Sequence, residues 1–255
     1  MRVMTANVRN ADRADDGHSW ESRKKVCARV IAACKPDVVG VQEATIDQVE
    51  WIAAALPEHA WHGLRQDPHG HPRNAVFVHR SLELVDRGGF WLSGTPHVPG
   101  STGWGAKYAR HVNWLVLADD SGSEWRVSNT HLDHMSEQAR AGAARLLAED
   151  AAAWPDETPQ VLMGDFNAGA GSTPLTTLER AGWRDAWAIA NPHQTDSGLT
   201  RHGFGQEAAA HPQRIDWIMV RGPVEVRAVQ VIRDRPDGAW PSDHYFMWAD
   251  VEAAR

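Results

Sequence analysis

The stretch Gln160-Val161-Leu162-Met163-Gly164-Asp165-Phe166-Asn167 decides how the chain folds. Its apolar run is typical of a strand that is covered on both faces. Asp165 and Asn167 lie two residues apart, so in extended backbone their side chains project from the same side. The small residues 168–172 follow, where a ligand could approach the backbone. A carboxylate and an amide at this end of a buried strand indicate an α/β enzyme site, although a plain turn explains the pair equally well.

The composition describes an ordinary globular protein and excludes several other classes. The 255 residues are 42% hydrophobic and 23% charged, enough to bury a core without disulfides or structural metals. The net charge of −7 gives no field that would attract duplex DNA, so non-specific nucleic-acid binding is not favoured. No apolar run is long enough to span a membrane, and the first residues have a strand pattern instead of a signal peptide. We therefore expect a cytoplasmic, monomeric protein that does not bind membranes.

The two cysteines, Cys27 and Cys34, are expected to be small core residues. They lie seven apart in a predicted helix, which separates them by about 10.5 Å along its axis and puts a disulfide out of reach. No zinc-binding spacing accompanies them.

Strands and helices follow one another along the chain in a pattern of crossovers and hairpins. Strands are predicted at 2–8, 37–43, 75–78, 82–92, 112–118, 124–129, 160–165, 214–220, 224–232 and 245–251, and helices at 19–34, 45–56, 136–153 and from Pro174 to just before Gly182. The segments 65–73, 95–110 and 191–212 are expected to be loops, and loops as long as the last are usually functional or mobile. The pattern favours two sheets packed face to face with helices outside, in one domain over residues 1–255.

Polar residues stand at the ends or entries of six predicted strands. They are Asn7, Glu43, His131, Asp165 with Asn167, Asp216, and Asp243 with His244. No nucleophile elbow, phosphate-binding loop or dinucleotide fingerprint is present. An oxygen-rich set without cysteine suits Mg²⁺ or Mn²⁺ better than Zn²⁺. A zinc pair of His131 and His134 is an alternative, but no third ligand spacing supports it.

Six motifs together resemble the endonuclease/exonuclease/phosphatase superfamily, in that family's order and over nearly the whole chain. They are Thr5-Ala6-Asn7, Val41-Gln42-Glu43, Asn129-Thr130-His131-Leu132, Gly164-Asp165-Phe166-Asn167, Arg214-Ile215-Asp216-Trp217-Ile218 and Ser242-Asp243-His244. The resemblance implies an α/β fold, a four-layer sandwich of two packed mixed sheets with helices on the outside. It also implies phosphoester hydrolysis that depends on a divalent metal, Mg²⁺ or Mn²⁺.

The resemblance also implies a role for each matched residue. Glu43 would be the principal metal ligand, with Asn7 and Asp243 supporting the metal. Asp165 would orient or deprotonate the attacking water, and Asn167 would hold water or phosphate. His244, oriented by Asp216, would contact the phosphate, and His131 would be a second imidazole there and a candidate general acid. Asp216 could instead form a salt bridge with Arg214.

Other residues are weaker candidates for holding the substrate. Arg9, Lys107 and Arg110 would bind a phosphate group, but surface cations are common and explain them equally well. His202 would line the pocket or, with equal weight, stabilise a turn. Asp133 and His134 are expected behind the site or on the surface.

The substrate is predicted to be a small phosphorylated molecule, cleaved as a phosphatase or phosphodiesterase would. Arg9 stands where apurinic-site endonucleases of the family place an acidic or amide residue, and the Trp-Cys-Asp-Arg core of the inositol phosphatases is absent. The acidic net charge and the lack of a basic stripe also disfavour nucleic acid. The alternatives are a nuclease acting on DNA, RNA or nucleotides and, less favoured, a non-catalytic binding module.

Overall fold

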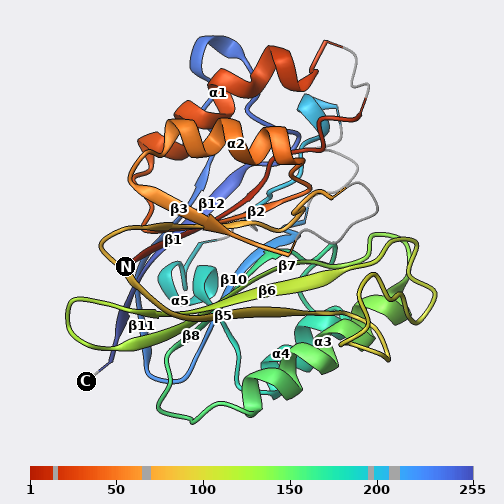
Figure 1. Cartoon of the computed structure of the whole chain (residues 1–255), viewed down its shortest axis with the longest axis vertical. Helices are drawn as coiled ribbons and strands as arrows, with labels where there is room; N and C mark the ends of the chain where they lie inside the picture. Colours follow the sequence, from red (N-terminus) through yellow and green to blue (C-terminus); the bar gives the residue numbers. More distant parts are fainter. Residues whose placement is uncertain (14–16, 65–69, 195–197, 207–212, 255) are drawn as a thin grey trace.

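The computed structural model describes residues 1–13, 17–64, 70–194, 198–206 and 213–254. Two six-stranded sheets pack face to face, with α1 and α2 on the outer face of one and α3 and α4 on the outer face of the other (Figure 1). This four-layer α/β sandwich confirms the predicted fold class.

Each sheet has two parallel central strands flanked by antiparallel pairs. The first sheet has the order β11 (Val224–Ile232), β12 (Phe246–Ala253), β1 (Arg2–Asn7), β2 (Val38–Gln42), β4 (Val76–His79) and β3 (His59–His62). The second has the order β5 (Glu83–Trp91), β6 (His111–Ala118), β7 (Glu124–His131), β8 (Gln160–Asp165), β10 (Asp216–Arg221) and β9 (Arg184–Asp185).

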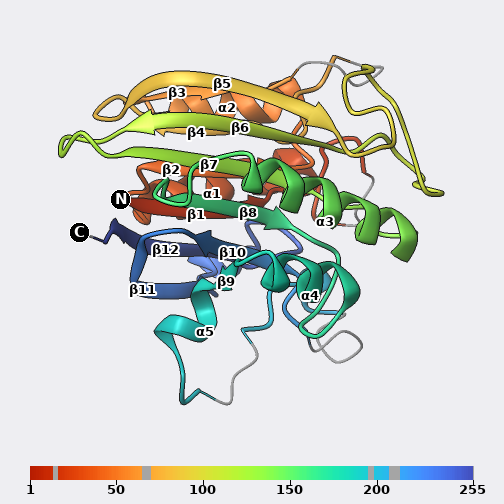
Figure 2. The ribbon, with the colours of Figure 1, turned by 90° about the horizontal axis from the view of Figure 1, so that it is seen from below.

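The helices begin at capping residues that the sequence indicates. α1 (Trp20–Ala33), α2 (Ile46–Ala55) and α3 (Glu137–Ala152) are capped by the side chains of Ser19, Thr45 and Ser136. α4 (Thr173–Arg180) has Pro174 in its first turn. Figure 2 shows α3 and α4 side by side over the second sheet. α5 (Ala186–Ala190) packs against β10 and β11 and so touches both sheets.

The buried strands are apolar on both faces because each face contacts a different core. In β8, Val161 and Met163 point to the core between the sheets, while Leu162 points to the core beneath α3 and α4. In β1, Val3 lies between the sheets and Met4 lies under α1 and α2. Alternation between two apolar layers therefore produces the continuous apolar runs of these strands.

The two halves of the molecule have the same architecture. The strands β11-β12-β1-β2-β4-β3 of one sheet correspond in order and direction to β5-β6-β7-β8-β10-β9 of the other, and α1 and α3 make the equivalent crossovers. Asn7 thus ends the strand equivalent to the one that His131 ends, while Glu43 directly follows the strand equivalent to the one that Asp165 ends.

The prediction missed three short elements: β3, β9 and α5. The edge strands have four and two residues, too few to show an alternating pattern. Cys27 and Cys34 are free and buried, as expected. In the described residues, no helix is long and apolar enough to cross a membrane.

Candidate active site

The six predicted strand ends meet at one end of the sandwich. The parallel pairs β1/β2 and β7/β8 end there, and β10 and β12 begin there. Asp165 lies directly across from His131 on one side and from Asp216 on the other. The structure therefore brings together residues from both halves of the chain.

Three residues at this edge have left-handed backbone conformations that only glycine adopts without cost. Arg9, Glu43 and Asn167 have φ angles of 55°, 66° and 47°. Each follows the end of a central strand and turns the chain away from the sheet. Strained non-glycine residues cluster at functional sites, where the surrounding structure holds them in place.

Asn7 joins the two carboxylates that follow β2 and end β8. Its Nδ2 donates to Asp165 Oδ2 at 3.0 Å and to Glu43 Oε1 at 3.4 Å. Its Oδ1 accepts the Arg9 backbone N–H at 3.0 Å. The Glu43 carboxylate also accepts the Asn10 N–H at 3.0 Å. Burial alone would raise the pKa of Glu43, but this hydrogen bond and the nearby His244, Arg9 and Arg110 lower it overall.

His244 and Asp216 form a buried ion pair. His244 Nδ1 lies 2.8 Å from Asp216 Oδ2, and both side chains are almost fully buried. Burial would lower the pKa of His244, but Asp216, with help from Asp243 and Asp165, raises it to about 10. His244 is therefore an imidazolium at neutral pH. Asp216 pairs with His244 instead of Arg214, because Arg214 makes a two-pronged ion pair with Asp185.

Asp165 lies at the centre of the site, where its proton affinity is raised. Its Oδ2 is 3.4 Å from His131 Nε2 and 3.9 Å from His244 Nε2. Burial and the neighbouring Asp216 carboxylate raise the pKa of Asp165 to about 7, although His244 and the Asn167 N–H oppose this rise. A carboxylate with such a pKa can take up a proton near neutral pH.

His131 is a neutral imidazole held by Asn167. Asn167 Nδ2 donates to His131 Nε2 and to the Leu132 carbonyl, both at 3.0 Å. Burial, and then Arg110 and His244, hold the pKa of His131 well below its usual value. A zinc pair of His131 and His134 gains no support, since the group of potential metal ligands found among the described residues contains neither of them and His134 is exposed.

Asp243 enters the site beside the end of β1. Its Oδ2 lies 3.3 Å from a guanidinium nitrogen of Arg9. The neighbouring Ser242 hydroxyl lies 3.3 Å from Asp243 Oδ1 and donates to the Asn7 carbonyl at 2.6 Å. Arg9 thus lies at the site, as the prediction for a substrate-binding cation requires.

The other three candidate substrate residues occupy different places. Arg110 is half-buried and lowers the pKa of His131, and burial leaves its Nε without a hydrogen-bond partner among the described residues. Lys107 is exposed and lies outside this group. His202 is buried, with its ring stacked on Trp240 and tilted against Tyr245. It is a packed residue of the loop that precedes β10, and it does not line an open surface.

The donor set fits a hard divalent cation. Among the described residues, the carboxylates of Glu43, Asp165, Asp216 and Asp243 lie near the cationic groups of His244, Arg9 and Arg110. Asp216 Oδ1 is also buried, and it has no hydrogen-bond partner among the described residues. Asp165, Asp216 and His244 have potential ligand atoms within 4.8 Å of one another, but His244 is itself a cation there. Oxygen ligands on the side of Glu43 are therefore the better match for Mg²⁺ or Mn²⁺.

Sequence reasoning missed the residues that hold these groups in place. The buried Arg23 of α1 donates to the carbonyls of Val8, Arg9 and Pro241, and so ties the end of β1 to the segment before His244. Its position four residues before Cys27, on the buried face of α1, was the available sign. Asn129 donates to carbonyls of the opposite sheet and accepts a hydrogen bond from Gln42. Asn129 and Gln42 both belong to the motifs quoted from the sequence.

Thr200 is a further holding residue that no pattern in the sequence marks. Its hydroxyl accepts the backbone N–H groups of Ile215 and Asp216 at 3.2 and 3.1 Å. Its carbonyl accepts the N–H of Tyr245, the residue after His244. Thr200 therefore fixes the backbones that carry both members of the Asp216–His244 pair.

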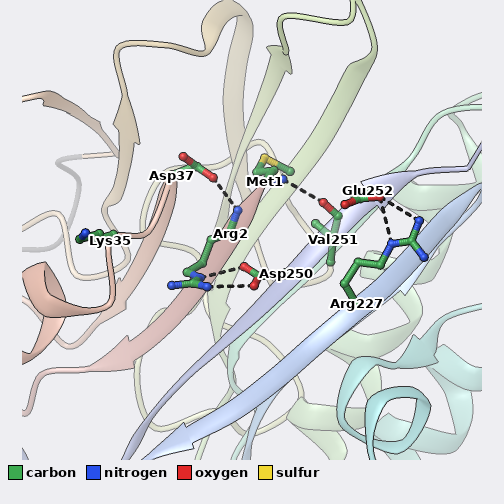
Figure 3. Close-up of a pocket in the computed structure, with 8 residues that line it drawn as sticks. All are labelled: Met1, Arg2, Lys35, Asp37, Arg227, Asp250, Val251 and Glu252. Atoms are coloured by element: carbon green, nitrogen blue, oxygen red, sulfur yellow. Dashed lines mark hydrogen bonds and ion pairs between the residues drawn. The ribbon is translucent and has the colours of Figure 1, made fainter.

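A hollow lies at the other end of β1, away from the candidate active site. It is an open depression of about 350 Å³ beside Arg2 and Glu252 (Figure 3). Arg2 there pairs with Asp250, and Arg227 pairs with Glu252. These paired charges tie strands together and lie about 17 Å along β1 from Asn7.

Comparison with known proteins identifies the family. The model of the endonuclease/exonuclease/phosphatase family matches residues 4–244. The chain belongs to this family. Members of the endonuclease/exonuclease/phosphatase family hydrolyse phosphoesters, and this chain is a phosphoester hydrolase of that family. A search of curated proteins gave no match.

Solved structures of the family are similar over the full length. A family protein from Bacteroides vulgatus is 30% identical, with a TM-score of 0.90 over 99% of this chain and 98% of that one. A mannosyl-6-phosphatase from Bacteroides thetaiotaomicron is 28% identical, with a TM-score of 0.88 over 99% of each chain. TDP2 from D. rerio, in complex with a single-strand DNA product, is 16% identical, with a TM-score of 0.80 over 99% of each chain, and shows the shared fold.

Proposed function

We propose that the protein is a Mg²⁺- or Mn²⁺-dependent phosphatase acting on a small phosphorylated molecule of the sugar phosphate class. The observation that carries this proposal is a buried Asp165 of raised pKa beside the His244 imidazolium and the Arg110 guanidinium. A proton acceptor next to fixed cations suits attack of water on a phosphate. The likeness to a mannosyl-6-phosphatase supports the sugar class.

Glu43 would be the main residue holding the metal, with Asp243 and Asn7 beside it. Bound there, a divalent cation would neutralise charge on the phosphate oxygens and the leaving oxygen. In the structure Asn7 uses its Nδ2 to orient Glu43 and Asp165, so its contribution to the metal site includes positioning those carboxylates.

Asp165 would orient the attacking water and accept its proton. As the new P–O bond forms, the ester P–O bond on the opposite side breaks, and the departing alkoxide takes a proton from solvent. Asn167, fixed by its hydrogen bonds to His131 and Leu132, would hold the water near Asp165 through its amide oxygen. In-line attack of this kind depends on positioning and on stabilising charge.

His244 and Arg110 would stabilise the charge that develops on the phosphate oxygens. Asp216 keeps His244 protonated and fixes its ring, so its Nε2 presents a proton toward the site. Neutral His131 would act as a hydrogen-bonding partner of the phosphate. Because these groups come from residues 7 to 244, we propose that the whole chain forms one catalytic unit.

A substrate panel tests the proposed function. Purified protein with Mg²⁺ should release phosphate from hexose 6-phosphates faster than it cleaves plasmid DNA or an RNA oligomer. Rapid cleavage of either polymer without phosphatase activity would establish the nuclease alternative. Absence of hydrolysis on every substrate would favour a binding module. Cytoplasmic location and a monomeric state remain our expectations from the sequence, and light scattering tests the latter.

A further inference from the structure

Two stacked side chains, Tyr108 and His134, adjoin the proposed phosphate site, and we call this pair the aromatic shelf. Tyr108 is 43% exposed and stacks on the ring of His134, with centroids 5.8 Å apart and planes 19° from parallel. Arg110 lies two residues after Tyr108, and its Nη2 is 3.5 Å from His134 Nδ1. The shelf therefore continues outward from the guanidinium that faces Glu43 and Asp165.

Hydrogen bonds of Asp133 and Ser136 hold the two loops of the shelf in place. Asp133 accepts the backbone N–H groups of Lys107, Met135 and Ser136 at 2.7 to 3.1 Å. The Ser136 hydroxyl donates to the Trp104 carbonyl at 2.7 Å. Both loops that carry the shelf are thus fixed to the start of α3, so the rings are held in place before a ligand arrives.

The residues around the shelf combine apolar surface with hydrogen-bond donors. Met135, next to His134, is 65% exposed. Lys107 Nζ lies 5.4 Å from the centre of the Tyr108 ring. Arg110 Nε, at the inner end, is buried without a partner among the described residues. An anionic group at Arg110 and a ring with hydroxyls over Tyr108 would satisfy these features together.

We propose that Tyr108 and His134 form a subsite for the sugar ring of a hexose phosphate whose phosphate is bound at Arg110. The C–H face of the sugar would pack on the exposed Tyr108 ring, and its hydroxyls would accept from Lys107. This inference rests on the proposed phosphatase function and names the residues that select the group esterified to phosphate.

The test compares three substrates in the same variants. With Mg²⁺ present, kcat/KM is measured for mannose 6-phosphate, for the acyclic glycerol phosphate and for a nucleoside 5′-monophosphate. In Tyr108→Ala, the ratio of kcat/KM for the hexose ester to kcat/KM for the acyclic ester should fall roughly tenfold. The fall should come from a higher KM for the hexose ester. Tyr108→Phe keeps the ring and should keep most of this ratio. His134→Ala should lower it as Tyr108→Ala does.

Trp51→Ala is the matched control, since Trp51 is a half-exposed aromatic on α2, away from this loop. An unaltered ratio in Tyr108→Ala, or a wild-type enzyme without preference for the hexose ester, overturns the subsite. If Tyr108→Ala lowers kcat/KM only for the nucleotide, the subsite binds a nucleobase and not a sugar, which contradicts the proposal. If the wild-type protein hydrolyses none of the three esters, the proposed function itself fails, and the subsite fails with it.

Discussion

At the scale of single residues, the site works through raised pKa values in two neighbouring side chains. Asp165 is a stronger base than an ordinary carboxylate, and His244 is a weaker acid than an ordinary imidazolium. Both are buried beside Asp216, whose charge raises both pKa values. The same carboxylate thus prepares one group to accept a proton and the other to keep one.

Replacing Asp165 by Asn should lower kcat about a thousandfold, because the amide cannot take a proton from water. The fold should persist, since the amide oxygen still accepts the Asn167 N–H, and only the Asn7 hydrogen bond to the second oxygen is lost. Phosphate release measures kcat, and circular dichroism checks the fold. Asp119→Asn, in the β6–β7 hairpin, is the control and should keep full activity. Full activity in Asp165→Asn would refute its role as the base.

The pH dependence of kcat/KM should be bell-shaped. Asp165 must be unprotonated to act as the base, so activity is lost as pH falls through about 7. His244 must be protonated to stabilise phosphate, so activity is lost as pH rises through about 10. A divalent cation near Asp165 would favour its charged form and move the acidic limb to lower pH. Stopped assays from pH 5 to 11 measure both limbs; an alkaline limb near 6.5 would contradict the Asp216–His244 pairing.

At the scale of elements, the close contact between β7 and β8 places Asp165 opposite His131. Gly164 has a φ of 146°, and a Cβ there would lie 1.9 Å from the Thr130 carbonyl oxygen of the neighbouring strand. That oxygen is backbone and cannot move aside without breaking the pairing that aligns the site. Glycine is therefore required at this position.

Gly164→Ala should destabilise the protein by more than about 3 kcal/mol, through a steric clash and a strained backbone. Urea unfolding followed by tryptophan fluorescence measures the loss. Gly122→Ala provides the comparison, because its φ is also positive, at 79°, but its Cβ would meet nothing within 4 Å. It should cost only about 1 kcal/mol. Equal losses in the two variants would show that backbone strain alone sets the requirement.

The contact of Thr200 with β10 and the entry to β12 makes a second prediction at this scale. Thr200→Val keeps the shape but leaves the N–H groups of Ile215 and Asp216 without their acceptor, at a cost of about 1–3 kcal/mol for the buried Asp216 N–H and less for the half-buried Ile215 N–H. The Asp216–His244 pair should loosen, lowering kcat about tenfold and moving the alkaline limb to lower pH. Thr200→Ser keeps the hydroxyl and should restore both. If Thr200→Val loses stability but the alkaline limb of its pH profile does not move, the role of Thr200 is purely structural.

At the scale of the whole molecule, the site forms where two similar halves meet. Each half contributes a carboxylate at or just after its second central strand, Glu43 in one and Asp165 in the other. The carboxylates are close enough for Asn7 to contact both. The two halves thus bring negative charge together at one place, and a bound divalent cation would offset this charge.

Removal of metal should therefore affect both activity and stability. EDTA should abolish hydrolysis, and Mg²⁺ or Mn²⁺ should restore it. A cation that binds only the folded protein should also raise Tm. At a concentration of a hundred times its Kd, it stabilises the folded state by about 2.7 kcal/mol. Glu43→Gln should remove most of this gain, whereas Glu225→Gln, on the exposed part of β11, should not. Activity unaffected by EDTA would refute the metal mechanism.

The sequence was most informative where a residue's role depends on its own strand. The central strands, the helix caps and the strand-end residues were all predictable from apolar runs and capping residues. The partners of these residues were not, because Thr200, Arg23 and Asn129 act through contacts with distant backbone. The short edge strands were missed because their pairing with β4 and β10 creates them.

The pairing of β1 with β12 has a consequence for how the protein is made. After β1 has left the ribosome, more than two hundred residues must be added before β12, its hydrogen-bonded neighbour, exists. Asn7 and Glu43 are therefore made long before Asp243 and His244. The nascent chain thus cannot assemble the proposed catalytic group until the entry to β12 has been made.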